Sequence, residues 1–438
     1  MHSLSQWSFG EKLRFRLIFL FFSLIILPFP LDTILGFFNI SQLTDWFNTF
    51  WIWLSSGLGK SLLGLEEIPT GITGSGDMTI DWLRYGSMLG LALLGTVIWT
   101  LADRSNKHYY KLWRVFVMVL TYYVVFYMFL YGSIKVFWLQ MPKLGIDRLI
   151  TTYGQSSPMG LLWTFMGASK TYSMYAGFSE VIAGLLLLFR RTRTLGGLVT
   201  AGVMFNVFML NMAYDVPVKL FSAQLMFMGL YIAMIDWKAV LGLFLFRKSN
   251  DVTPWPPFFK SIQANLILLL IQVLFIGKVA YDRVEADLER RARSGEIRET
   301  SPLFGLYDVT EFVRNGDTLP PLLTDDIRWQ RLIMERPTSS VIVHMDERFR
   351  YILSEVDTNA QTVTFHIGRD SLRKSYPFEY KKLADGLTMK GILEEDTLQM
   401  RLKTYPVENL YLTNDRFKFN WINERPWHVY DREIKSNW

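Results

Sequence analysis

The chain has 438 residues, of which 50% are hydrophobic and only 20% charged, a composition too apolar for a soluble protein of this length. The formal net charge of +6 is uneven: 22 Lys and Arg stand against 13 Asp and Glu up to Val279, and 24 against 27 beyond it. A basic excess in the loops between apolar segments is typical of membrane proteins and argues against nucleic acid as a partner. Because cysteine is absent, thiolate chemistry, disulfides and iron–sulfur clusters are excluded.

Seven apolar stretches are long enough to cross a bilayer. The first covers about 11–30. It follows basic residues as a signal peptide would, but it lacks a small-residue cleavage site, so we interpret it as a retained span. The others cover about 82–101, 113–138, 172–189, 195–214, 218–237 and 258–279. The aromatic segment 46–63 has two interpretations, a helix in the membrane interface or an eighth span.

The charges of the loops predict an orientation. Basic residues gather at 14–16, 104–114, 190–193 and 247–248, in every second loop, and acidic residues occupy the loops opposite. Seven spans with a cytoplasmic N-terminus satisfy this alternation. We therefore expect a protein of the bacterial inner (cytoplasmic) membrane whose C-terminal region is extracytoplasmic, which means periplasmic in a bacterium with two membranes.

The pattern changes after the last span. A charged stretch at 281–300 predicts a helical stalk that continues the span. From 301 to 438, short alternating runs separated by turn signals such as Asn315-Gly316 predict about eight strands. These runs are 304–312, 340–345, 350–356, 362–367, 376–381, 387–392, 398–403 and 417–422. Consecutive antiparallel strands favour a closed up-and-down barrel, similar to a lipocalin, because closure removes exposed edges.

Alternation also predicts which side chains face the barrel interior. One face carries Val363, Phe365, Ile367, Leu387, Met389, Leu398, Met400, Leu402, Phe417, Phe419 and Trp421. At eight strands the interior is either filled by such side chains or holds one small ligand. His366 is out of phase with Phe365, so we expect it on the outside.

Several motifs in the middle of the chain resemble the DoxX-like membrane family. They are 130–137 (LYGSIKVF), Ser157-Pro158, 165–170 (FMGASK), 175–184 (YAGFSEVIAG), 202–206 (GVMFN) and 211–219 (NMAYDVPVK). The resemblance covers roughly 130–237 and implies a four-helix membrane bundle. The tail is similar to the extra domain of long, Bacteroidetes-type members through 305–309, 312–316 and 419–426. The family includes subunits of a thiosulfate:quinone oxidoreductase, but without cysteine no thiol-based redox role transfers.

Glu180 lies inside an apolar stretch, where an ionised carboxylate is expensive unless it faces the bundle and finds a cation. By depth, Lys135 and Lys170 are the nearest cations, and we predict that Glu180 faces Lys135. Two interpretations remain open: a structural ion pair, or a carboxylate that relays protons or binds a substrate.

A second polar group lies on the next span. Asn211, Asp215 and Lys219 are spaced by four residues and share a helix face up to the bend at Pro217; Asn206 and Tyr214 lie nearby. These residues predict an outward-facing polar pocket near Glu180, with donors suited to a quinone headgroup. The alternative is structural: intramembrane Asn joins helices by hydrogen bonds, and Asp-Val-Pro ends a span.

The sequence disfavours haem and metal cofactors. The five histidines, His2, His108, His344, His366 and His428, all lie outside the predicted spans and lack ligand spacing. A quinone is the one cofactor that stays open.

From these patterns we expect the chain to divide into four regions: N-terminal spans with the possible interfacial helix at 1–110, a DoxX-like bundle at 111–280, a helical stalk at 281–300 and a β-barrel domain at 301–438. Our first hypothesis is an accessory or scaffold subunit of a cell-envelope membrane complex, whose β domain binds protein partners and whose spans contact lipid. The alternatives are a quinone-linked oxidoreductase subunit and a lipophile-binding carrier or sensor that uses the barrel as a cup. The sequence leaves open whether the protein is an enzyme.

Overall fold

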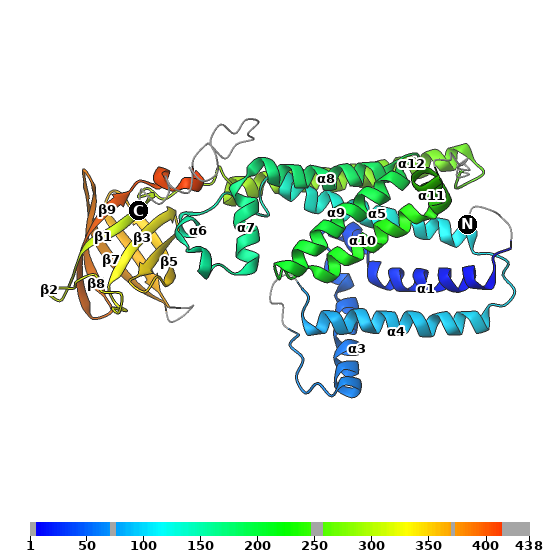
Figure 1. Ribbon diagram of the computed structural model, residues 1–438, viewed down its shortest axis with the longest axis horizontal. Coiled ribbons are helices and arrows are strands. Elements are labelled where there is room, and N and C mark those ends of the chain that lie inside the picture. Colours follow the sequence, from blue (N-terminus) through cyan, green and yellow to red (C-terminus); the bar gives the residue numbers. More distant parts are fainter. Residues whose placement is uncertain (1–5, 71–75, 247–256, 369–372, 414–438) are drawn as a thin grey trace. The chain divides into compact units, whose positions relative to one another are not determined.

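The computed structural model describes residues 6–70, 76–246, 257–368 and 373–413. By its contacts the chain forms two compact units. One comprises Met1–Val136 with Tyr175–Ala286, and the other Phe137–Met174 with Asp287–Trp438. The first unit is helical, and the second combines helices with a β-barrel (Figure 1).

Most helices belong to the first unit. They are α1 (Phe9–Ile26), α2 (Leu31–Gly36), α3 (Asp45–Leu63), α4 (Thr79–Ala102), α5 (Tyr110–Val136), α8 (Lys170–Leu188), α9 (Arg193–Ala213), α10 (Lys219–Ala233), α11 (Trp237–Phe246) and α12 (Ile262–Ser294). The start of α8, up to Met174, and the end of α12, from Asp287, belong to the second unit. Seven segments of the described chain are long and apolar enough to span a membrane: Phe9–Gly36, Thr79–Ala102, Tyr110–Val136, Lys170–Leu188, Arg193–Ala213, Lys219–Phe246 and Ile262–Ser294. The seven predicted spans are thereby confirmed, and α12 continues without a break into the predicted stalk as far as Ser294.

Helix α5 is the central helix of the bundle. Most of its side chains are apolar, as expected of a helix that is buried on most faces. Trp113, Leu120, Val124 and Met128 are each at most 1% exposed, and they pack against residues of α1, α8, α9 and α10. The core of the first unit is therefore built around α5.

Helix α3, the aromatic segment, is not among the seven candidate spans. It runs across α4 rather than alongside it (Figure 1). Trp51 and Gly59 are buried on the side that meets α4, whereas Trp46 and Trp53 remain exposed. By length and hydropathy α3 is not a candidate span, and its location in the membrane interface stays a prediction.

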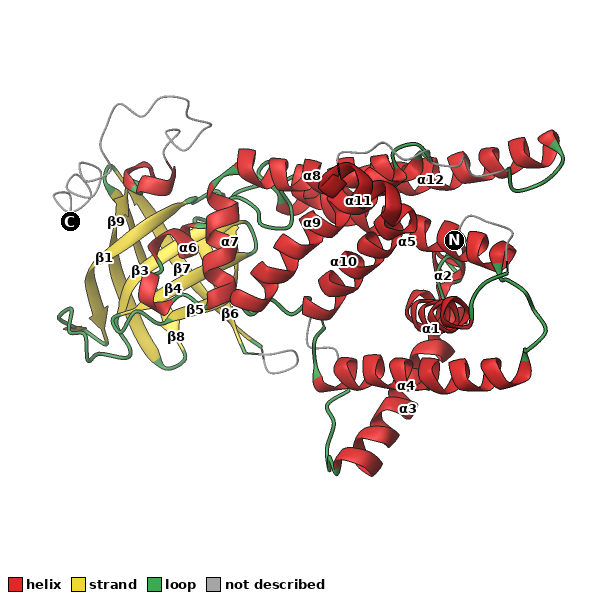
Figure 2. Cartoon of the chain, turned by 45° about the vertical axis from the view of Figure 1, so that its right-hand side comes forward, coloured by secondary structure: helices red, strands yellow, loops and turns green. Residues whose placement is uncertain are grey.

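Nine antiparallel strands form the sheet of the second unit: β1 (Gly305–Arg314), β2 (Asp317–Thr318), β3 (Trp329–Arg336), β4 (Ser339–His344), β5 (Phe349–Asp357), β6 (Thr362–Ile367), β7 (Lys374–Leu383), β8 (Gly386–Leu393) and β9 (Asp396–Tyr405). Each strand from β3 to β9 pairs with its neighbour in sequence, and β1 pairs with both β3 and β9. This closes an eight-stranded up-and-down barrel (Figure 2), and the short β2 folds back at the Asn315-Gly316 turn to pair antiparallel with the end of β1. The predicted closed barrel is confirmed.

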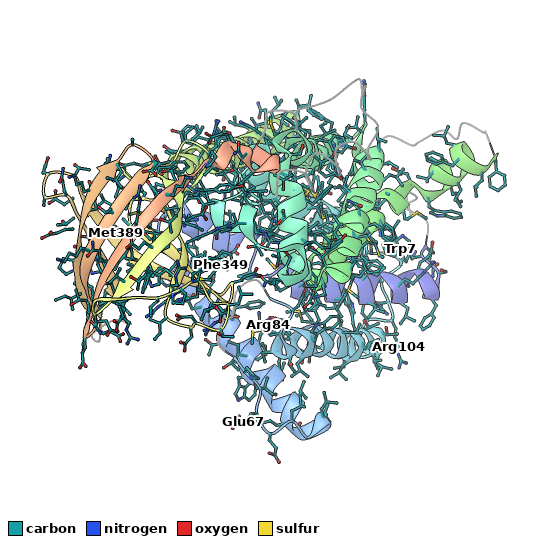
Figure 3. All side chains as sticks on the ribbon, turned by 60° about the vertical axis from the view of Figure 1, so that its left-hand side comes forward. Trp7, Glu67, Arg84, Arg104, Phe349 and Met389 are labelled. Carbon is teal, nitrogen blue, oxygen red and sulfur yellow. The ribbon has the colours of Figure 1, made fainter. Side chains whose placement is uncertain are left out.

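The interior of the barrel is filled by side chains. Phe312, Phe365 and Phe378 are fully buried, and the Trp329 ring packs against all three. Met389 on β8 belongs to the same cluster (Figure 3). The predicted inward face is confirmed at Val363, Phe365, Leu387, Met389, Leu398, Met400 and Leu402, with Ile367 partly buried beside them. Phe417, Phe419 and Trp421 lie outside the described residues, as does the tail motif at 419–426.

One member of the predicted strand set differs. β3 is not among the predicted strands, and the predicted strand at 417–422 lies outside the described residues. The sequence of β3, WQRLIMER, does not alternate between apolar and polar residues, because both faces of this strand are covered. Leu332 and Met334 belong to the interior core, while Ile333 is buried with residues of the outer face.

The cover on that outer face is provided by α6 (Ile146–Ile150), which α7 (Pro158–Ala168) follows in the chain. Ile146 packs against Leu306, Ile333 and Val343 from β1, β3 and β4. Segment Phe137–Met174 thus belongs to the C-terminal unit, although we expected it within a bundle at 111–280. The partner surface of α6 is made partly by β3, so the sequence did not reveal where this segment packs.

Candidate functional site

Two glycines bring α5 and α8 into backbone contact. A Cβ added to Gly132 would lie 2.9 Å from the carbonyl oxygen of Gly177, and one added to Gly177 would lie 2.6 Å from the carbonyl oxygen of Gly132. Small residues of this kind allow membrane helices to approach closely. Lys135 and Glu180 each follow their glycine by three residues, so this contact sets the two charged side chains opposite each other.

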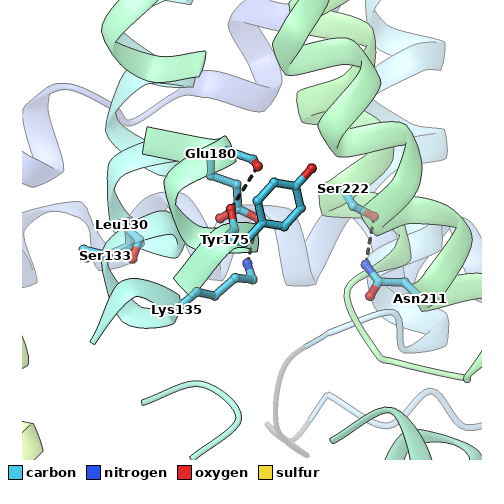
Figure 4. Close-up of polar contacts among 8 residues, drawn as sticks. Leu130, Ser133, Lys135, Tyr175, Glu180, Asn211 and Ser222 are labelled. Atoms are coloured by element: carbon cyan, nitrogen blue, oxygen red, sulfur yellow. Dashed lines mark hydrogen bonds and ion pairs between the residues drawn. The ribbon is translucent and has the colours of Figure 1, made fainter. Parts of the chain in front are cut away.

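The predicted pairing of Glu180 with Lys135 is confirmed. Lys135 Nζ donates to Glu180 Oε1 at 2.7 Å (Figure 4). The side chains are 8% and 1% exposed, so both charges are withdrawn from solvent. The Lys135 ammonium also lies 5.8 Å from the centre of the Tyr131 ring, within the range of a cation–π interaction. The pair is a buried, mutually neutralising ion pair between two spans.

The second carboxylate oxygen of Glu180 takes no part in the ion pair. Glu180 Oε2 is buried and has no hydrogen-bond partner among the described residues. A carboxylate oxygen in such a place has unused capacity to accept one donor or to carry a proton. The ion pair therefore leaves one carboxylate oxygen of Glu180 able to bind a donor or a proton.

Lys170, the other cation considered for Glu180, has a different partner. Its Nζ donates to both carboxylate oxygens of Glu296, at 2.7 and 2.8 Å, and lies 5.6 Å from the centre of the Trp138 ring. Arg291 also donates to Glu296. These donors, Lys170 first, hold the pKa of the Glu296 carboxyl below its ordinary value.

Asn211 is used for a local structural purpose. Its Nδ2 donates to Ser222 Oγ at 3.0 Å (Figure 4) and to the carbonyl oxygen of Val218 at 3.3 Å. Asn211 is 4% exposed. These bonds tie the end of α9 to the start of α10, which agrees with the structural interpretation of this residue.

The remaining residues of the predicted pocket are dispersed. Asn206 is exposed on α9, and Tyr214 is half-buried at its end. Lys219 Nζ meets Asp215 Oδ1 at 2.8 Å, as their spacing predicts, but the Asp215 side chain is 83% exposed. No hydrogen bond or ion pair joins Asn206, Asn211 or Asp215 to Glu180 in the described part of the chain. The single pocket expected near Glu180 is therefore not assembled from this set.

Other polar contacts around α10 were not predicted. Asp77 Oδ1 accepts from the backbone N–H of Leu220 at 3.0 Å, which caps the first turn of α10 from a distant loop. Gln224 is 5% exposed; its Nε2 donates to Tyr123 Oη at 2.7 Å, and its Oε1 accepts from Tyr85. The signal for this network was a lone glutamine within an apolar span.

Among the described residues, no group of three or more His, Asp and Glu side chains is placed to hold a metal ion. His366 lies half-buried on the outside of β6, where its Nδ1 is 2.9 Å from Ser375 Oγ. His2 and His428 lie outside the described residues.

Comparison with known proteins adds one partial similarity. No family model matches the chain, and no solved structure matches it significantly. The uncharacterized protein YwoB of Bacillus subtilis (strain 168) is 29% identical over 131 residues, which are 28% of this chain and 77% of that protein. Its description assigns no activity. The similarity therefore covers a minor part of the chain and carries no function to it.

Proposed function

We propose that the protein is an accessory membrane subunit: a DoxX-like helical bundle holds a packed β domain outside the cytoplasm, and the β domain binds a protein partner of a cell-envelope complex. The observation that carries this proposal is the filled barrel. Phe365, Phe378 and Met400 are at most 1% exposed in its interior, so the domain has its outer surface, and not an inner cup, available for binding. The same observation weighs against a carrier that holds a lipophile inside the barrel.

The bundle supports the same proposal. Buried polar side chains join its helices to one another in the pairs Lys135–Glu180 and Asn211–Ser222. Such contacts fix helix positions, which is what a scaffold requires. The loop charges support the orientation, with basic loops on the cytoplasmic side and the β domain on the other.

Site-specific photo-crosslinking in the native membrane tests this function. Leu353 and Ile392 are apolar side chains on the outside of the barrel, 42% and 58% exposed, and each is replaced by a photoreactive amino acid. The buried Met400 serves as the matched control position. We expect a discrete polypeptide to be cross-linked from an outer position and to co-purify in gentle detergent. A protein that is never cross-linked and purifies alone would contradict the accessory role.

A second candidate function rests on Glu180 Oε2, the buried oxygen without a partner. In a quinone-linked subunit this oxygen would accept a hydrogen bond or a proton from a quinol. The Glu180→Gln variant keeps an oxygen for Lys135 and removes the titratable carboxyl. Quinone that co-purifies with the native protein and is lost from this variant at unchanged thermal stability would favour this candidate, and equal quinone content in both would exclude it.

A further inference from the structure

A second site lies within the C-terminal unit, between the α6–α7 segment and the outside of the barrel. A cavity of about 490 Å³ opens there, a volume in the range of small-molecule sites. Its walls come from the α6–α7 segment on one side and from Arg298, β3, β4 and β5 on the other. Figure 2 shows α6 and α7 beside these strands.

The cavity is rich in cations. Lys143, Arg148, Arg298 and Arg336 line it, against two carboxylates, Asp147 and Glu335. A surplus of positive side chains in a concave site concentrates anions. How many of the four cations are free to bind an anion depends on which of them are already paired with the two carboxylates.

Both carboxylates are already engaged. Glu335 accepts from the backbone N–H of Ile146 at 3.0 Å and from the guanidinium of Arg298. Asp147 Oδ2 accepts from Tyr351 Oη at 2.9 Å. Burial and the neighbouring Asp147 raise the pKa of Tyr351 to about 12, so its hydroxyl keeps its proton and remains a donor.

Three cations remain without a carboxylate. Lys143, Arg148 and Arg336 form no ion pair with any described residue. Lys143 and Arg336 are exposed, whereas Arg148 is half-buried. Three unpaired cations around one cavity are the arrangement that recognises a phosphate group.

The Arg148 side chain is held in place by a hydrogen bond to α7. Its Nε donates to Thr164 Oγ1 at 2.6 Å, which fixes the guanidinium and leaves its terminal nitrogens for a ligand. One of them, Nη2, lies so close to α7 that a Cβ added to Gly160 would be 3.0 Å from it. Gly160 is in the first turn of α7, whose positive end also favours an anion.

We propose that this cavity, lined by Lys143, Arg148 and Arg336, binds a phosphate-bearing ligand. Trp163 and Met159 supply apolar surface beside the cations, which suits a phosphate attached to an organic group. The chain enters this segment from α5 and leaves it into α8, two candidate spans, so a lipid headgroup and a free phosphorylated solute are both within reach. The site does not depend on the accessory role proposed above.

Binding to the full-length protein in a non-ionic detergent tests the proposal. The probes are dihexanoyl phosphatidylglycerol, its phosphatidylcholine counterpart and sodium phosphate, each followed by calorimetry. The test variant is Lys143→Glu with Arg336→Glu, at two exposed positions. The control is Lys381→Glu with Lys390→Glu, which makes the same change of charge on exposed strand residues that do not line the cavity.

We expect the test variant to weaken binding by at least about tenfold, because two charge-assisted contacts become repulsive, and the control to stay within about twofold. Binding of phosphatidylglycerol but not of sodium phosphate would identify a lipid headgroup as the source. Binding of sodium phosphate with similar affinity would identify a free phosphate. Equal binding of phosphatidylcholine would support recognition of the phosphate group itself rather than of net negative charge. Equal losses in both variants, or no binding of either anionic probe, would overturn the proposal.

Discussion

Lys135 and Glu180 meet at 2.7 Å in the helical unit, three residues beyond the contact between Gly132 and Gly177. Charge and packing are therefore coupled at this place. The glycines allow the helices to approach, and the approach puts each charge within reach of the other. The ion pair and the glycine contact can therefore be tested separately.

Replacement of one partner of the ion pair should cost more stability than replacement of both. Glu180→Leu leaves a buried ammonium without its carboxylate, and Lys135→Leu leaves a buried carboxylate without its ammonium, each with an expected loss of about 3–5 kcal/mol. The double variant removes both charges and should recover much of the loss. Thermal unfolding of the three variants in the same detergent measures this. A double variant that loses the sum of the single losses would show that the two residues do not act as a pair.

A side chain at Gly177 should force α5 and α8 apart. In Gly177→Ala the new methyl group meets backbone atoms of Gly132 and Val136 at 2.6 Å, and backbone cannot give way as a flexible side chain does. We expect a loss of about 1–3 kcal/mol. Gly202→Ala is the matched control, since a Cβ at Gly202 meets nothing within 4 Å. The melting temperatures of the two variants should differ clearly; similar values would argue against a tight α5–α8 contact.

The aromatic core should carry much of the stability of the barrel. Phe365 is fully buried, and its ring packs edge-on against Trp329 and Phe378. Phe365→Ala should cost about 3–5 kcal/mol, because it removes buried surface and leaves a cavity. Lys390→Ala, on the outside of β8, serves as the control. Denaturant unfolding monitored by near-ultraviolet circular dichroism follows the packed rings directly, and an unaffected midpoint would mean that the barrel is loosely filled.

Acid should weaken the contacts of Glu296. Lys170 and Arg291 lower the pKa of this carboxyl in the folded protein from the ordinary 4.5. A carboxyl with a lowered folded pKa contributes stability that is complete above its unfolded pKa and is lost as the pH falls through the folded pKa. Native protein should therefore exceed Glu296→Gln in stability at pH 7, and the difference should shrink below about pH 4.5. A difference that stays constant from pH 7 to pH 3 would contradict the lowered pKa.

Sequence reasoning succeeded where one physical signal dominates. Apolar length located the spans, and alternation located seven of the eight barrel strands and their inward residues, because over most of their length these strands have one face toward the core and the other toward solvent. The pairing of Lys135 with Glu180 followed from the cost of a lone charge among apolar side chains.

It failed where a residue's environment depends on distant segments. β3 has two covered faces, so its Leu332-Ile333-Met334 run shows no period of two. Its outer cover, α6, comes from a loop between spans whose packing no local pattern announces. The cationic cavity was missed for the same reason: Arg148 and Arg336 are 188 positions apart in the sequence and come together because the α6–α7 segment packs on the outside of the barrel. Asn211 looked like a ligand donor because its true partner, Ser222, lies beyond a bend.

The packing of α6 on the barrel also sets an order of events during synthesis. Ile146 leaves the ribosome 160 residues before Leu306, the nearest in sequence of the outer-face residues that it covers. The seam between β1 and β9 closes later still, after Tyr405 has been made. Until then the apolar side of α6 and the open edges of the sheet are exposed, which is a condition that invites aggregation. The strands that cover α6 are therefore completed only long after α6 itself has been synthesised.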